Sequence, residues 1–371
     1  PFNLTIDTNA VQITFNAIVD DTGNSASDFL TNATSMLLQG RATPGATITV
    51  TVNGIAQTTT VTSGNTAGED GLAAWTYVLP TLNPGTYTVG VRASTPAAGN
   101  SQTVTRSLTI DTTAPAVAIT GINDGASSGN IPTNDTTLIF NGTAESGSLV
   151  TLTVTNAQNN TQVFQQTVNA VAGTWRIDRT NSNLPGGSYN ITATATDAAG
   201  NVSTTVTRSL EIDTTAPNAP TITSVTDDVA PITGTISSTT GDTTPTLNIT
   251  AEAGSTVEVF NGNTKLGNAT ATGLGIYTFT TTALTPGTYS LTARATDAAG
   301  NTSGSSAAFS LIIDTTAPSA PTITGFTDDV APVTGVVNTS STNDPTPTLN
   351  ITAEAGSTVE VFVGNTKLGD A

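Results

Sequence analysis

Apolar and polar residues alternate with a period of two along most of the chain. The stretches YSLTARA at 289–295 and ITVTV at 48–52 both follow this alternation. Such a pattern buries one face of a β-strand and leaves the other face in water. Gly, Asn and Pro interrupt it roughly every 8–12 residues, which predicts about seven short strands per ~100 residues, as in an antiparallel sandwich. No stretch has the period of a helix.

The strands belong to a longer repeat. The motif IDTTAP stands at 110–115, 212–217 and 313–318, and ATDAAGN stands at 195–201 and 295–301. A period of about 100 residues is too long for a solenoid unit of ~20–50 residues, so each repeat is expected to be a domain with its own core.

The motifs define the domain boundaries that we predict. Because PFNLTI at 1–6 is similar to AFSLII at 308–313, the parent protein is expected to continue in both directions. The predicted units are residues 1–6 as the last strand of a preceding repeat, 7–110 as a divergent repeat 1, 111–212 as repeat 2, 213–313 as repeat 3, and 314–371 as the N-terminal part of a truncated repeat 4.

Aromatic residues recur at fixed places in the complete repeats. A tyrosine follows a Pro-Gly turn and opens the next-to-last strand of each: Tyr87, Tyr189 and Tyr289. Immunoglobulin-like sandwiches place a corner tyrosine there, whose hydroxyl bonds to nearby backbone. The preceding strand carries an expected core anchor in each repeat: Trp75, Trp175 and Tyr277. A sugar-stacking role is the alternative for these aromatic residues.

The two motifs and their spacing resemble the bacterial immunoglobulin-like tandem repeats of giant surface adhesins, of the biofilm-associated and type-I-secreted, RTX-adhesin-like kind. The resemblance implies an all-β chain of tandem seven-stranded immunoglobulin-like β-sandwich domains in an elongated array. It also implies an extracellular stalk on the bacterial cell surface, often with calcium at the junctions between domains.

The acidic residues are expected to gather at the two ends of each sandwich. In repeat 3, Asp213, Glu252 and Asp297 fall at the end where the first strand begins, and Asp227 and Asp228 fall at the opposite end. Stacked repeats would bring these ends together, and Ca²⁺ is the cation that takes six to eight hard oxygen ligands. The predicted calcium ligands are Asp20 and Asp21 with Asp111, Glu145 and Asp197; Asn123 and Asp124 with Asp213, Glu252 and Asp297; and Asp227 and Asp228 with Asp314 and Glu354.

Solvated acidic loop tips are the alternative to calcium ligation. Repeat 1 argues for a shared site, because Thr43 replaces the glutamate and Pro96 replaces the aspartate of the later repeats. The top of repeat 1 is therefore expected to bind no calcium in this way, although Glu69 and Asp70 offer a separate site there.

Composition narrows the function classes. The 371 residues include no Cys and no His, and 27 acidic residues against 9 basic ones give a net charge of −18. The missing Cys and His remove the usual nucleophiles, general bases and zinc ligands, so we expect no enzyme. The negative charge argues against nucleic acid. We see no apolar run long enough to insert into a membrane.

The expected function is a structural stalk that projects a distal adhesive domain for surface attachment or biofilm formation. Its expected partners are neighbouring repeats, and a host or surface ligand bound through a domain outside this chain. Two alternatives remain open: a carbohydrate- or receptor-binding β-sandwich module, and a subunit of an extracellular fibre that self-associates by strand complementation.

Overall fold

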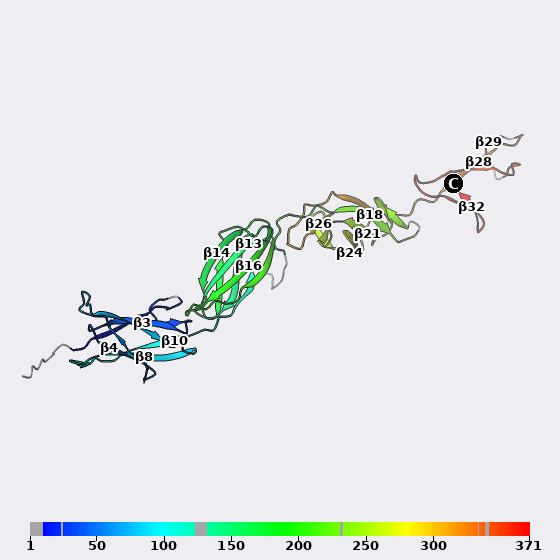
Figure 1. The fold of residues 1–371 in the computed structure, drawn as a ribbon. Coiled ribbons are helices and arrows are strands. Elements are labelled where there is room, and N and C mark those ends of the chain that lie inside the picture. The colour runs from blue at the N-terminus through cyan, green and yellow to red at the C-terminus, as the bar shows by residue number, and fades with distance from the viewer. Residues whose placement is uncertain (1–9, 24, 123–131, 231–232, 333, 338–340) are drawn as a thin grey trace, which may run out of the picture. The chain divides into compact units, whose positions relative to one another are not determined.

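The computed structural model describes residues 10–371 except 24, 123–131, 231–232, 333 and 338–340 (Figure 1). These described residues form β-strands joined by turns and contain no helix. The chain divides into two compact units: Pro1–Ala216 with Ala298–Asn301, and Pro217–Asp297 with Thr302–Ala371. The expected all-β, immunoglobulin-like architecture is confirmed.

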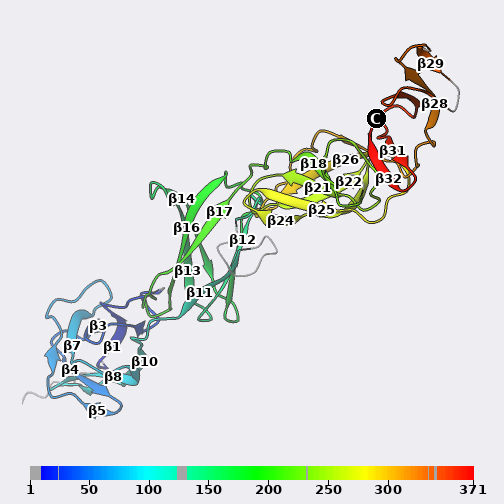
Figure 2. The ribbon, with the colours of Figure 1, turned by 90° about the vertical axis from the view of Figure 1, so that its right-hand side faces the viewer.

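Repeat 1 is a sandwich of two sheets. One sheet has the order β1-β3-β7, and the other has the order β2-β10-β8-β4-β5, with β6 on β4 and β9 on β8 (Figure 2). The strands are β1 (Ile13–Ile18), β2 (Leu30–Thr31), β3 (Met36–Ala42), β4 (Thr47–Val52), β5 (Ile55–Ala56), β6 (Val61–Thr62), β7 (Ala73–Leu79), β8 (Gly85–Thr95), β9 (Gly99–Asn100) and β10 (Val104–Ile110).

The described residues of repeat 2 form seven strands, the number that the pattern predicts. Its sheets have the orders β11-β12-β15 and β14-β13-β16-β17, and β13, β14 and β16 lie side by side in Figure 1. The strands are β11 (Val117–Ile122), β12 (Ile139–Ala144), β13 (Leu149–Asn156), β14 (Gln162–Asn169), β15 (Thr174–Asp178), β16 (Gly187–Thr196) and β17 (Val206–Ile212).

Repeat 3 keeps the two-sheet plan with extra short strands, in the orders β19-β18-β21-β25-β24 and β20-β27-β26-β22-β23. Its strands are β18 (Thr221–Asp227), β19 (Gly234–Ile236), β20 (Thr239–Thr240), β21 (Thr246–Thr250), β22 (Thr256–Asn261), β23 (Thr264–Asn268), β24 (Thr270–Gly273), β25 (Ile276–Thr280), β26 (Gly287–Thr296) and β27 (Phe309–Ile313). Residues 314–371 add β28 (Thr322–Asp328), β29 (Gly335–Val337), β30 (Thr348–Thr352), β31 (Glu360–Val363) and β32 (Thr366–Asp370).

Each complete repeat has its own core between its two sheets. The predicted aromatic anchors Trp75, Trp175 and Tyr277 are only 2–3% exposed, which confirms their packing role. Trp175 lies opposite Gly142, where a Cβ atom would stand 2.3 Å from the indole. Repeat 3 pairs the smaller Tyr277 with Ile249 at the same place. A large ring therefore requires a glycine across the strand pair, since a packed core leaves no spare volume.

The predicted tyrosine corners are confirmed. The hydroxyl of Tyr87 donates to Asn83 O at 2.9 Å, and the hydroxyls of Tyr189 and Tyr289 donate to Pro185 O and Thr285 O at 2.8 Å. Each bond ties the start of the next-to-last strand to the turn before it. In Tyr189 burial raises the pKa of the hydroxyl, so it remains a donor at neutral pH.

A short segment before the second long strand runs parallel to the last strand of each complete repeat. It is β2 against β10 in repeat 1, the single bridge of Thr133 with Ile212 in repeat 2, and β20 against β27 in repeat 3. This pairing leaves one threonine at the exit of each repeat, directly beside the next IDTTAP motif.

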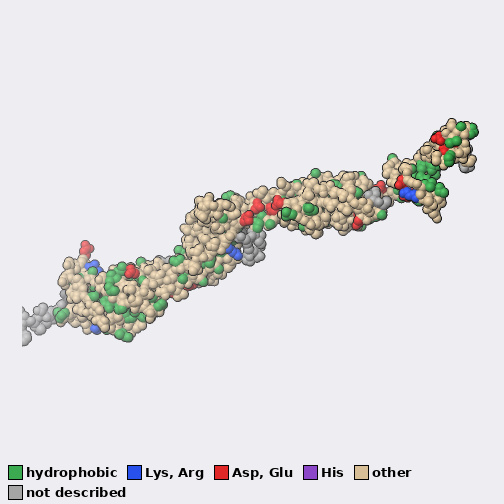
Figure 3. Space-filling view, turned by 45° about the vertical axis from the view of Figure 1, so that its right-hand side comes forward, with side chains coloured by type: hydrophobic (Ala, Val, Ile, Leu, Met, Phe, Trp, Pro, Cys, Tyr) green, Lys and Arg blue, Asp and Glu red, His purple; other side chains and the backbone are tan. Residues whose placement is uncertain are grey.

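The surface carries little charge. Most of the face seen in Figure 3 shows neither acidic nor basic side chains, in keeping with a chain that is 10% charged. Within the part of the chain that the structure describes, no helix is long and apolar enough to cross a membrane.

The Tyr189 corner can be tested in a chain whose only tryptophan is Trp175, made with Trp75→Phe. Tyr189→Phe should lower the free energy of unfolding of repeat 2 by about 1 kcal/mol, because one net hydrogen bond is lost. Denaturant titration followed by Trp175 fluorescence measures it. Tyr289→Phe in repeat 3 is the matched control and should leave the Trp175 transition in place. Equal effects of the two variants would contradict the corner's role.

Candidate functional site: the junctions between repeats

The aspartate of IDTTAP is held by backbone hydrogen bonds at each repeat boundary. Asp111 N–H donates to Thr31 O at 2.9 Å, Asp213 N–H to Thr133 O at 2.9 Å, and Asp314 N–H to Thr240 O at 2.9 Å. The accepting threonines belong to the parallel segments described above. The first residue of repeats 2, 3 and 4 is thereby fixed to the exit of the repeat before it.

The side chain of this aspartate is used within its own motif. Asp111 Oδ1 accepts the N–H of Thr113 at 2.9 Å, and Asp213 and Asp314 make the same bond two residues on, also at 2.9 Å. Such a turn fixes the backbone just before the proline, which itself restricts the residue that precedes it. One carboxylate oxygen of each aspartate is therefore already an acceptor.

The ATDAAGN turn folds onto the same aspartate. Asp197 is 4% exposed, and its Oδ1 and Oδ2 accept the N–H and the side-chain amide of Asn201, each at 2.8 Å. The amide of Asn201 also donates to Asp111 O at 2.8 Å, and that of Asn301 donates to Asp213 O at 2.8 Å. The two motifs recur together because they are hydrogen-bonded to each other.

A second group of carboxylates lies buried at the exit end of repeat 3. Asp227 and Asp242 are each 1% exposed and are linked through Thr240, whose hydroxyl donates to Asp227 Oδ2 at 2.5 Å and accepts the N–H of Asp242 at 2.9 Å. Asp242 Oδ1 accepts the N–H of Thr244 at 2.7 Å. Asp242 Oδ2 is buried and has no hydrogen-bond partner among the described residues.

Repeat 4 contains the same arrangement. Asp328 and Asp344 are 2% and 5% exposed, and the hydroxyl of Thr342 donates to Asp328 Oδ2 at 2.5 Å and accepts the N–H of Asp344 at 3.0 Å. Its recurrence marks the carboxylate–threonine–carboxylate link as a property of the repeat.

Repeat 1 has a related buried oxygen. Asp21 Oδ2 accepts the N–H of Phe29 at 3.3 Å, while its Oδ1 is buried without a partner in the described chain. Burial raises the pKa of the Asp21 carboxyl and the nearby charge of Asp28 raises it further, against the lowering effect of the Phe29 bond.

The remaining predicted ligands are not gathered in this way. Asp20, Glu145, Asp228, Glu252, Asp314 and Glu354 are exposed, and Asn123 and Asp124 lie outside the described residues. In the described part of the chain no three His, Cys, Asp or Glu side chains form a group that would hold a metal ion.

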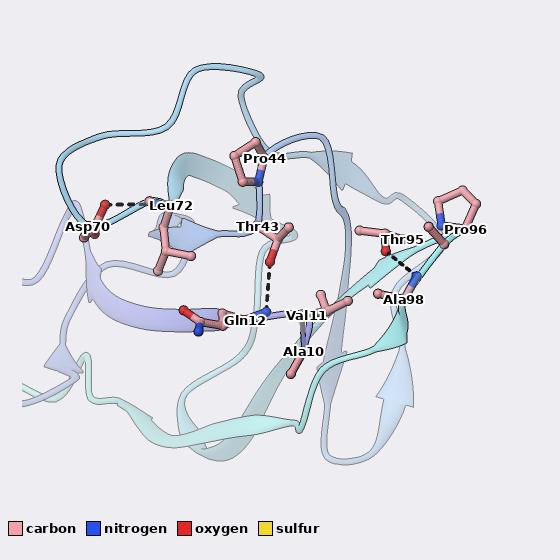
Figure 4. Close-up of a pocket in the computed structure, with 12 residues that line it drawn as sticks. Ala10, Val11, Gln12, Thr43, Pro44, Asp70, Leu72, Thr95, Pro96 and Ala98 are labelled. Carbon is pink, nitrogen blue, oxygen red and sulfur yellow. Dashed lines mark hydrogen bonds between the residues drawn. The ribbon is translucent and has the colours of Figure 1, made fainter. Parts of the chain in front are cut away.

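The top of repeat 1 is built differently from the later repeats. A cavity of about 700 Å³ opens there, lined in part by Val11, Thr43, Leu72 and Pro96 (Figure 4). Thr43 Oγ1 accepts the N–H of Gln12 at 2.9 Å. Asp70 accepts the N–H of Leu72 at 3.1 Å and pairs with Arg41 at 2.9 Å, so both of its oxygens are engaged.

A family model described as "Bacterial Ig-like domain" matches residues 5–112, 113–214 and 218–315, which together are more than half of the chain. The chain belongs to the bacterial Ig-like domain family.

Several other proteins are similar to this bacterial Ig-like chain. Exoglucanase B of Cellulomonas fimi is 37% identical over 146 residues, which are 36% of this chain and 12% of that protein. A solved tetra-tandem repeat from the extending region of a large adhesion protein is 21% identical, with a TM-score of 0.24, over 83% of this chain and 74% of that one. The BSP domain of a biofilm associated protein is 15% identical, with a TM-score of 0.20, over 83% and 67%.

Sequence reasoning left Asp242 out of the predicted ligands of the Ig-like junction. The signal that marks it is an aspartate two residues after a threonine whose hydroxyl accepts the aspartate's N–H in repeats 2, 3 and 4: Asp135, Asp242 and Asp344. Asp242 is buried because the segment before it, β20, pairs with β27. This segment has only two residues, too few to show an alternation of apolar and polar positions.

The two hydrogen bonds between Asp197 and Asn201, which we call the clamp, should stabilise the Ig-like repeat 2 even when no calcium is present. With chelator present, Asp197→Ala should cost about 2–3 kcal/mol of unfolding free energy, because it removes a charged acceptor and leaves the Asn201 donors unpaired. Glu145→Ala, exposed on a neighbouring turn, should change it by less than about 0.5 kcal/mol. Denaturation followed by Trp175 fluorescence measures both. A cost for Asp197→Ala no larger than that for Glu145→Ala would rule out the clamp.

The raised pKa of Asp21 predicts a pH dependence for repeat 1. The folded state holds this proton more tightly than the unfolded state, so ionised Asp21 costs stability above the raised pKa. With chelator present, Asp21→Asn should raise the melting temperature at neutral pH, and the gain should fade as the pH falls from the raised pKa toward the ordinary value of 3.8 and be lost below it. Trp75 fluorescence follows the transition. Asp20→Asn, at an exposed residue, is the control, and a gain that does not depend on pH would refute the assignment.

Proposed function

We propose that this chain is a spacer segment of a large bacterial cell-surface adhesin, of the biofilm-associated and type-I-secreted kind. In this role the tandem Ig-like repeats hold a distal adhesive domain away from the cell, and that domain binds the host or surface ligand. The neighbours of each repeat in the same chain are then its direct partners.

The junction geometry is the observation that carries the proposal. The same backbone bond from the IDTTAP aspartate occurs at the start of repeats 2, 3 and 4. What the repeats preserve is thus the way one domain is joined to the next. A chain selected for connection between domains fits a spacer better than a chain selected for a unique binding loop.

Calcium at the junctions is the second part of the proposal. A buried carboxylate oxygen with no partner is costly, and Asp242 Oδ2 lies in the same buried group as the Asp227 carboxylate. A hard divalent cation would satisfy both charges. Asp227 and Asp242 would hold it, and calcium would complete its shell with backbone carbonyls, which it accepts readily. The ion would then bind the loops at the end of each repeat and limit their motion.

Exoglucanase B favours a second candidate, a spacer in a multi-domain secreted protein that acts on carbohydrate, because its matched segment is 37% identical to this chain. Both candidates use the repeats as spacers and differ in the domains that they connect. The core positions of Trp75 and Trp175 leave neither indole free to stack on a sugar ring. We therefore expect no retention of this chain on cellulose or a glycan array, and retention would favour the binding-module alternative.

Calcium titration of the full chain tests the metal. Calorimetry should detect bound Ca²⁺, and Asp242→Asn should remove one site because it removes the unpartnered oxygen. Glu258→Gln is the matched control in the same repeat, since Glu258 lies in β22 and pairs with Lys265.

Small-angle scattering with and without chelator measures the consequence for the spacer. When calcium is withdrawn, the scattering profile should change from that of a stiff rod to that of a flexible chain, because no cation then offsets the repulsion among the acidic residues. A profile that chelator leaves unchanged, or calorimetry without heat of binding, would reject calcium stiffening.

A further inference from the structure

The sequence AAGN forms a turn in each complete repeat, at residues 97–100, 198–201 and 298–301, and we call it the AAGN turn. The AAGN turn of repeat 2 makes direct contact with repeat 1. The hydroxyl of Thr22 lies 2.8 Å from Ala199 O, and Ala199 is 1% exposed. Both residues belong to the same compact unit.

Two glycines allow the backbones to approach. Gly23 and Gly200 have φ values of +101° and +91°, where residues with a side chain are strained. A Cβ on Gly23 would stand 2.0 Å from Ala198 O, and a Cβ on Gly200 would stand 2.9 Å from Gly23 N. The contact is therefore between main chains, and neither position has room for a methyl group.

The donor side of the contact is prepared within repeat 1. Thr22 Oγ1 accepts the N–H of Asn32 at 2.8 Å and has Asn32 Oδ1, Thr31 Oγ1 and Ala199 O as neighbours at 2.8, 2.9 and 2.8 Å. The Thr22 hydroxyl thus links the backbone of Asn32, which lies just before β3, to the backbone of Ala199 in repeat 2.

The AAGN turn of repeat 3 makes an equivalent contact with repeat 2. Asn134 follows Thr133 as Asn32 follows Thr31, and its N–H donates directly to Ala299 O at 3.1 Å. Both of these residues lie in the first compact unit, which includes Ala298–Asn301. In repeat 1 the Thr22 hydroxyl stands between the Asn32 N–H and the carbonyl of the turn, whereas in repeat 2 the Asn134 N–H bonds to the carbonyl directly. The acceptor in both cases is the carbonyl of the second alanine of the AAGN turn.

We propose that the AAGN turn is a docking element that joins each Ig-like repeat to the repeat before it through backbone contacts, without a metal ion. Its partner surface is the approach to the second long strand of the preceding repeat, which supplies one donor and no bulky side chain. This docking is independent of the calcium proposed above, because none of its atoms belongs to a carboxylate.

Spin-label distances across the junction of repeats 1 and 2 test the docking in the full chain. The protein has no cysteine, so Thr76→Cys in β7 and Gln166→Cys in β14, both at exposed residues, give one label on each repeat. All samples contain chelator. The parent distance distribution should be narrow, and Gly200→Ala should broaden it by about twofold or more, since relative motion is the default for domains without a firm interface.

Gly99→Ala is the matched control. Gly99 occupies the same place in the AAGN turn of repeat 1, with φ +77° and nothing within 4 Å of its Cβ position. It therefore carries similar backbone strain without the contact, and its distribution should match the parent. Broadening by Gly99→Ala equal to that by Gly200→Ala would overturn the proposal, as would a narrow distribution for Gly200→Ala or a broad one for the parent.

A second pair of variants avoids backbone strain. Thr22→Val removes the hydroxyl and should broaden the distribution, whereas Thr22→Ser keeps it and should restore the parent width. Equal widths for the two would overturn the role of the hydroxyl. Because chelator is present throughout, these results do not depend on whether calcium binds, which the calorimetry and scattering experiments test separately.

Discussion

One residue is hydrogen-bonded to two domains at the start of repeats 2 and 3. The N–H of Asp111 is bonded to Thr31 of repeat 1, and its C=O accepts Asn201 of repeat 2. A connector bonded on both sides cannot rotate about its own φ and ψ without breaking one of the bonds. The sandwiches themselves are ordinary, and the properties of the array depend on this residue.

The alternation of apolar and polar residues was sufficient to predict antiparallel sandwiches, and the repeated motifs predicted their tandem arrangement. A period of two reports which side chains face the core, and the core is what sets the two-sheet plan. The tyrosine corners were predictable for the same reason: Tyr189 follows a turn at a fixed place, and its hydroxyl needs only a local carbonyl. Extra short strands such as β5 and β24 were not predictable, because two to four residues carry too little pattern.

The site was predicted less well, and the reason is physical. Sequence shows where carboxylates fall but not which hydrogen-bond donors reach them. Asp197 was expected to bind an ion, yet both of its oxygens accept bonds from Asn201, only four residues further on. Asp242 was passed over, although burial leaves one of its oxygens without a partner.

The parallel pairing of β2 with β10, and of β20 with β27, has a mechanical consequence. Tension on the chain draws the early segment toward the N-terminus and the last strand toward the C-terminus, so the two parallel segments are pulled in opposite directions along their length. Their hydrogen bonds then share the load in shear and do not open one after another. A repeat pulled at its ends resists extension at the place where the next repeat is attached, and the force that reaches one domain passes to its neighbour while both remain folded.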